Sequence, residues 1–240
     1  MSSCFSTACL LPSLVQIDTP TPPSNLPCIT QTFVRPLDKF PKDFDKKIHD
    51  EKNKSRGITP TQNERMLLNS LLVSIYKNDP DIIIGHDLLG PGLEVLLNRM
   101  KDLKADHWSR IGRFRRSAWP QIGKSGQGYL WRFCAGRLVC DLASDAAKSM
   151  ISSTTWSLSE MCKTHLGIER EDIDPDDTAS YLDGSLANPT KMLVFLKHCE
   201  ADAYFQMAIA MKVQILGLTR QLTGLAGNGW YVYPTLHCSL

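Results

Sequence analysis

A short run of β-branched residues between two stretches with helical periodicity constrains the fold most. Residues 82–84 are three consecutive isoleucines, with an Asp-Pro pair just before them and Gly85 directly after. A short apolar run bounded by turn-forming residues is typical of a strand buried on both faces. Apolar residues recur at helical spacing over 66–75 before this run, and over about 92–103 after it. This order predicts an α/β fold with a mixed sheet.

Strands and helices alternate along the rest of the chain as well. Further strands are expected within 4–17, over 29–34 and over 136–142, and the four prolines of 18–27 predict a loop. Three sequence patterns predict where helices begin. Thr61 and Glu64 have the spacing of a capping box, Ser157 and Glu160 repeat it, and Asn188 precedes a proline. Asn188 and the proline after it predict the start of a helix that runs to about residue 217, with a further helical piece to residue 225. The acidic stretch 167–190 predicts a loop.

Composition excludes several classes of protein. The formal net charge is only +2, so any affinity for nucleic acid must come from local clusters of charge. None of the eight cysteines forms a Cys-x-x-Cys pair, which argues against a zinc site and favours reduced thiols in a cytosolic or nuclear protein. No apolar run reaches the ~18 residues of a membrane span, so we expect no membrane association.

Several separate blocks of the sequence resemble B-family DNA polymerases, and within that family the alpha-type catalytic subunits. The blocks lie in family order and spacing, and they are DPDIIIGHDLLGPGLEVLLNR at 79–99, KADHWSRIGR at 104–113, CAGRLVCD at 134–141 and QLTGLAGN at 221–228. The resemblance runs from about residue 8 to residue 228. It implies the exonuclease-like domain of such a polymerase.

The resemblance also implies a fold and a domain division. We expect a ribonuclease H-like exonuclease fold, a mixed sheet flanked by helices that is incomplete at its N-terminal strand. This domain would occupy 1–228 and carry a basic insertion at 107–137, and 229–240 would form a C-terminal tail unlike the family. Since no palm domain follows, the resemblance implies a truncated product that cannot polymerise DNA by itself.

The nuclease site of this family is expected to be lost. Active relatives bind two metal ions with about four carboxylates, and the pair from the first motif is not found near the start of this chain. The acid position of the second motif is Gly92, which has no side chain to hold a metal. In the third motif Asp202 is retained, whereas His198 replaces the tyrosine one helical turn earlier. One carboxylate cannot assemble the site, so the sequence predicts no catalytic and no metal-binding residues, and no cofactor for this chain, although the full-length family uses magnesium.

A basic stretch carries the candidate DNA contact. From 107 to 140 there is no acidic residue, and Arg110, Arg113, Arg115 and Arg116 stand close together among aromatic residues. Arginines interleaved with aromatics suit a nucleic-acid backbone or a single strand. The alternative is a solvated loop that balances the acidic run 169–177. Trp119 and Trp156 are expected to pack in the core rather than to stack on bases.

Three functions remain open at this point. The resemblance favours part of a replicative DNA polymerase, a DNA-directed nucleotidyltransferase that extends primers, with this domain inactive and structural. It implies DNA template and primer, primase and accessory subunits as partners, and a nuclear location. The alternatives are an active 3′–5′ exonuclease and a stand-alone module that binds single-stranded DNA or another replication protein.

Overall fold

The computed structural model describes residues 4–9, 29–50, 57–119, 132–150, 155–170, 172–174, 177–182, 188–225 and 227. Five strands are described within these ranges: β1 (Cys4–Cys9), β2 (Ile29–Val34), β3 (Ile58–Pro60), β4 (Ile82–Gly85) and β5 (Leu138–Asp141). The longer helices are α3 (Glu64–Asn78), α4 (Leu93–Asp102), α8 (Pro189–Lys212) and α9 (Ile215–Leu225). Shorter helices and turns are α1 (Phe44–His49), η1 (Leu88–Gly92), η2 (Trp108–Ile111), α5 (Asp145–Met150), α6 (Leu158–Met161), η4 (Cys162–Leu166) and α7 (Thr178–Leu182).

The described strands form two small sheets, whereas the sequence predicted one mixed sheet. In the first sheet β1 runs antiparallel and β3 parallel to β2; in the second β4 and β5 are parallel, with Ile82 opposite Leu138. Pro60 ends the short strand β3 and has no N–H to extend a ladder. The residues of β4 line an apolar cavity of about 270 Å³ together with Leu71 of α3 and Met207 of α8. The mixed α/β class is confirmed, but the continuous sheet is not seen in the described part of the chain.

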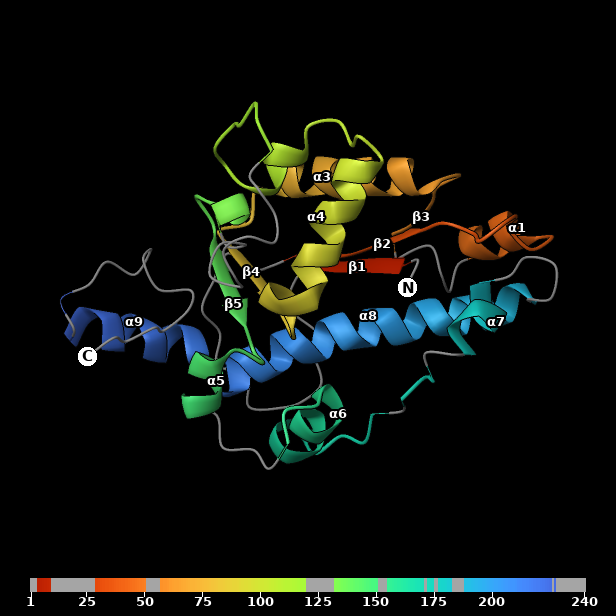
Figure 1. Ribbon diagram of the computed structural model, residues 1–240. Helices are drawn as coiled ribbons and strands as arrows, with labels where there is room; N and C mark the ends of the chain where they lie inside the picture. The colour runs from red at the N-terminus through yellow and green to blue at the C-terminus, as the bar shows by residue number, and fades with distance from the viewer. Residues whose placement is uncertain are drawn as a thin grey trace.

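Helix α8 holds the two sheets in one body. It lies against β1, β2 and β4, and Figure 1 shows it running below both sheets. Its first half buries Met192 and Leu196 in a cluster with Val34 and Phe44. Its last turns bury Ile209 in a second cluster that includes Leu142, just after β5. Residues on α8 are therefore rigidly placed relative to both sheets.

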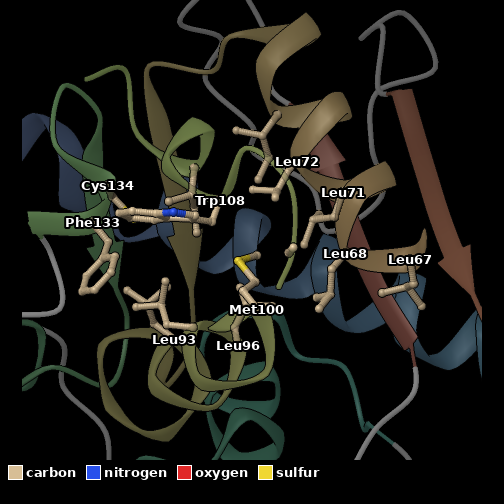
Figure 2. Close-up of a cluster of buried hydrophobic side chains, with 14 of the residues drawn as sticks. Leu67, Leu68, Leu71, Leu72, Leu93, Leu96, Met100, Trp108, Phe133 and Cys134 are labelled. Carbon is tan, nitrogen blue, oxygen red and sulfur yellow. The ribbon is translucent and has the colours of Figure 1, made fainter. Parts of the chain in front are cut away.

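A third cluster lies between α3, α4 and the segment around η2 (Figure 2). It buries most of the apolar positions that the helical spacing predicted, including Leu67, Leu68, Leu71 and Leu72 of α3 and Leu93, Leu97 and Met100 of α4. Met66, the first apolar position of that spacing, is 46% exposed instead. Each such side chain contributes roughly 1.5–3 kcal/mol when it is removed from water. Trp108 and Trp119 stack at 4.1 Å between ring centroids against this cluster, and Trp156 packs beside the cluster that contains Leu142. The packing roles predicted for Trp119 and Trp156 are confirmed.

Two of the three predicted helix starts are correct. Ser157 and Asn188 accept backbone N–H bonds from Glu160 and Thr190, as N-cap residues do. The start predicted at Thr61 is wrong, because the N-cap of α3 is Asn63, which accepts a bond from the N–H of Met66 at 2.8 Å. The Thr61 hydroxyl is buried and donates to the carbonyl of Val34 at 2.9 Å, so it fastens the helix entry to β2.

Two other boundaries differ from the sequence prediction. The last helical region breaks at 213–214, where Gln214 adopts a positive φ of 53°, and does not continue to residue 217. The acidic stretch predicted as a loop contains the short helix α7, whose Leu182 is buried against Phe195 and other residues of its cluster. In both places tertiary packing outweighs the local sequence signal. The predicted tail 229–240 lies outside the described residues.

Candidate functional site: an arginine on the retained acid, and a basic surface

The two remnants of the third motif face the same side of α8. His198 and Asp202 are four residues apart, one helical turn, so their side chains lie one above the other. The His198 Nε2 atom is 3.5 Å from Asp202 Oδ2, and the two side chains are 18% and 22% exposed. Both side chains are therefore half-buried.

Arg170 occupies the space that a cation would take beside Asp202. Its Nε and Nη2 donate to the two oxygens of the Asp202 carboxylate at 2.6 and 2.8 Å, the bidentate geometry that makes the strongest ion pairs. Nη2 also lies 3.1 Å from His198 Nε2, and because a guanidinium can only donate, that nitrogen accepts. Nη1 donates to Ser159 Oγ at 3.1 Å and to the carboxylate of Asp172.

This network neutralises the retained acid. The hydrogen bond and the charge of Asp202 raise the pKa of the Arg170 guanidinium further above its ordinary value, so the group is charged at every accessible pH. Both oxygens of Asp202 accept from Arg170, which leaves the carboxylate poorly placed to ligate a metal ion. Arg170 also joins α8 to α6, because Ser159 belongs to α6 and Asp202 to α8.

Gly92, the position that the sequence analysis assigned to the lost acid, is the last residue of η1 and the N-cap of α4. It lines the 270 Å³ cavity together with Ala203, the neighbour of Asp202. The side of the cavity near Gly92 therefore offers no carboxylate. Glu94 is exposed and does not replace it.

The described residues at these positions do not fit the two-metal site of an active exonuclease. The fit requires several free carboxylate oxygens that converge on each ion, whereas here one acid is bonded to an arginine and another position is glycine. Within the described ranges, no group of three or more His, Cys, Asp and Glu side chains is arranged to hold a metal ion.

The four predicted DNA-contacting arginines are not equivalent in the structure. Arg113 donates to the carboxylates of Asp79 and Asp81 at 3.0 and 2.6 Å, so its charge is balanced within the protein. The Arg110 guanidinium lies over the ring of Tyr76, 4.4 Å from its centroid. Arg115 is exposed and Arg116 half-buried. Among the described residues, no carboxylate pairs with Arg110, Arg115 or Arg116.

Sequence reasoning missed two structural arginines: Arg170, which bonds Asp202, and Arg137, which supports the surface around η2. Arg170 stands alone inside an acidic run, and this isolated positive charge was the only signal of its role. The Arg137 side chain is 2% exposed and bonds Asp79 at 2.8 Å and the Ile111 carbonyl at 3.1 Å. Nothing in its sequence neighbourhood distinguishes it from the exposed arginines nearby.

Three free cysteines are buried in the described part of the chain: Cys134, Cys140 and Cys162. Burial raises the pKa of Cys134 and Cys140 to about 12 and that of Cys162 to about 11. A thiol with such a pKa is almost entirely protonated near neutral pH and a poor nucleophile. Cys140 lies in β5 and packs in the cluster that contains Leu142.

The fold and the site together define a mixed α/β domain in which Asp202 on the long helix α8 is neutralised by an internal arginine. Comparison with protein families matches residues 12–161 to the exonuclease domain of DNA polymerase family B. The chain therefore belongs to this family.

Curated proteins similar to this chain include the catalytic subunits of one polymerase from several organisms. The DNA polymerase alpha catalytic subunits of Xenopus laevis and Mus musculus are each 37% identical over 190 residues, which cover 79% of this chain and 12% of the relative. Their counterpart from Saccharomyces cerevisiae is 32% identical over 227 residues, covering 90% of this chain and 15% of the relative. The chain thus spans about an eighth of the length of these relatives. No helix in the described ranges has the length and apolar character needed to cross a membrane.

Proposed function

We propose that this domain is a catalytically inactive exonuclease domain that serves as structural scaffold in a replicative polymerase of the alpha type. The observation that carries the proposal is the bidentate bond from Arg170 to Asp202. A guanidinium supplies the positive charge that stabilises the buried carboxylate, but it cannot polarise a water molecule as a metal ion does. The retained acid then contributes to folding and not to hydrolysis.

The similarity to alpha catalytic subunits supports the wider context of this proposal. Such a polymerase would extend primers on a DNA template, in the nucleus, together with primase and accessory subunits. The role of this domain there would be to keep α8 and the two sheets in a fixed arrangement beside the DNA. The domain is not proposed to transfer nucleotides itself, so polymerisation would depend on other parts of such a protein.

The first test of the proposal is a nuclease assay. We expect that the purified chain does not shorten a single-stranded oligonucleotide in magnesium or manganese. An Asp202→Ala variant should give the same result. A B-family exonuclease with a complete set of acids serves as the positive control. Shortening by the wild-type chain that disappears in Asp202→Ala would establish the active-exonuclease alternative instead.

A second function is favoured by the charge of the surface around η2. Arg110, Arg115 and Arg116 lack carboxylate partners among the described residues, so we propose that they contact the phosphate backbone of DNA. Arg113, by contrast, supports the surface through its ion pairs with Asp79 and Asp81. Contacts of this kind neutralise phosphates and release counterions, and they do not read sequence.

The DNA contact predicts a specific salt dependence. Changing Arg110, Arg115 and Arg116 together to alanine should weaken binding to single-stranded DNA. It should also reduce the slope of log affinity against log salt by about 2, at about 0.7 per lost contact. Titrations at several salt concentrations measure both quantities. Arg65→Ala is the matched control, because Arg65 is exposed but paired with Asp106 at 3.0 Å. An unchanged slope in the triple variant would show that the three arginines are solvated and do not contact the phosphates.

A further inference from the structure

We call the surface around η2 that carries Arg110, Arg115 and Arg116 the basic surface. It contains a cavity of about 350 Å³ where the end of α3 meets η2 and the residues after it. Its walls include Tyr76, Arg110, Arg113, Phe114, Arg115 and Arg137, and we call it the arginine cavity. A cavity of this volume accommodates a small ligand. Three features of its walls specify which chemistry it would accept.

The first feature is a surplus of positive charge. Asp79 and Asp81 balance Arg113 and Arg137, the two arginines at the base of the cavity. Arg110 and Arg115 remain, and no carboxylate in the described part of the chain pairs with either. Arg110 lies over the Tyr76 ring, 4.4 Å from its centroid, and the ring leaves the guanidinium N–H groups free to donate hydrogen bonds to a ligand. The cavity therefore favours an anion that accepts several hydrogen bonds, such as a phosphate group.

The second feature is an exposed aromatic ring between the arginines. Phe114 is 64% exposed, which is unusual for a side chain that gains so much from burial. It stands between Arg113 and Arg115 in the sequence and forms part of the cavity wall. A bare ring next to unpaired guanidinium groups is suited to a ligand with a planar ring and a phosphate.

The third feature is a rigid base. Arg137 bonds the carbonyls of Ile111 and Pro80 as well as Asp79, so it ties η2 to the turn between α3 and β4. Arg113 bonds the carbonyl of Gly136 at 3.1 Å and that of Asp79 at 3.1 Å. These contacts fix the backbone from which Phe114 and Arg115 extend. The site is thus organised before any ligand arrives, which reduces the entropic cost of binding.

We propose that the arginine cavity binds one nucleotide of single-stranded DNA, with a phosphate held by Arg110 and Arg115 and the base stacked on Phe114. This inference rests on the proposed DNA contact of the basic surface and assigns it a stacking subsite. Bases in a duplex are already stacked on their neighbours, so only an unpaired base can cover the ring. The subsite accepts any base, since every base has a π face.

The test compares Phe114→Ala, Phe114→Trp and the wild-type chain in binding to a labelled oligothymidylate, measured by fluorescence anisotropy. Loss of the stacked base should weaken binding about tenfold in Phe114→Ala, whereas Phe114→Trp should retain the wild-type affinity. The salt slope should be the same in all three proteins, because no phosphate contact changes. Leu225→Ala, which removes a side chain that is 85% exposed on α9, is the control for loss of an exposed apolar group.

The outcomes separate the subsite from the DNA contact on which it rests. Unchanged affinity in Phe114→Ala, together with weak binding by the triple arginine variant, would overturn the stacking subsite and leave the phosphate contact standing. An equal loss of affinity for duplex and single-stranded DNA in Phe114→Ala would also overturn it. Absence of measurable binding by the wild-type chain would overturn both. Because Phe114 is exposed, thermal unfolding of the variants should match the wild type.

Discussion

Replacing Arg170 with alanine should lower the free energy of unfolding by about 3 kcal/mol, because it leaves a half-buried carboxylate without its partner. Asp202 would lose both of its charge-assisted hydrogen bonds, at 2.6 and 2.8 Å, and Ser159 and His198 would each lose a donor. Denaturant unfolding followed by circular dichroism measures the change.

A double-mutant cycle and an exposed ion pair make this prediction specific. Adding Asp202→Ala to Arg170→Ala should recover part of the loss, since the unpaired charge is removed, and the coupling between the two sites should exceed about 1 kcal/mol. Arg65→Ala, which breaks the exposed pair with Asp106, should cost only about 0.5 kcal/mol. Equal effects of Arg65→Ala and Arg170→Ala would show that the buried network does not stabilise the domain.

A methyl group added at Gly112 should destabilise the domain by about 3 kcal/mol, the upper end of the usual cost of overpacking. The Cβ of an alanine there would lie 2.6 Å from the carbonyl oxygen of Phe133 and 2.9 Å from that of Ala135. Both contacts are with backbone, which cannot move aside as a flexible side chain can. The Ala135 oxygen also accepts the N–H of Arg113 at 2.9 Å, so the clash would disturb the base of the arginine cavity.

Gly217 provides the matched control of opposite sign. It lies inside α9, and a Cβ there meets no atom within 4 Å, so Gly217→Ala should stabilise the helix by about 0.5–1 kcal/mol. Thermal or denaturant unfolding of both variants gives the comparison. If Gly112→Ala unfolds at the same denaturant concentration as the wild type, the close approach of the turn to residues 133–135 is not a feature of the folded protein.

The parts of the fold that the sequence predicted depend on local chemistry. Three β-branched isoleucines bounded by turn-forming residues fit a pleated strand whose side chains are at least half-buried, and 82–85 are indeed β4. The caps at Ser157 and Asn188 follow from side chains that bond the backbone two or three residues away. At the start of α3 two candidate caps stand close together, so the local pattern alone cannot distinguish them. In the structure the Thr61 hydroxyl bonds the carbonyl of Val34 on β2, so Thr61 does not cap the helix and Asn63 does.

The division into two sheets could not be read from the sequence. Pairing of strands depends on which edges meet, and that depends on how α8 packs across both sheets. A strand of three residues such as β3 carries little local signal, and neither does a helix of five residues such as α7. Their positions follow from buried side chains, Ile58 and Leu182, that belong to one cluster.

The candidate site divides in the same way. The sequence by itself determined that Gly92 cannot ligate a metal, since the missing side chain is a property of the residue. It also determined that positive charge accumulates near Arg110–Arg116. Only the tertiary structure decided that Arg170 bonds Asp202, and that Arg113 is paired with Asp79 and Asp81. The physical reason is that an ion pair requires about 3 Å between groups that lie 32 to 34 residues apart in the chain. The packing of η2 on α3 and of η4 on α8 brings these groups together.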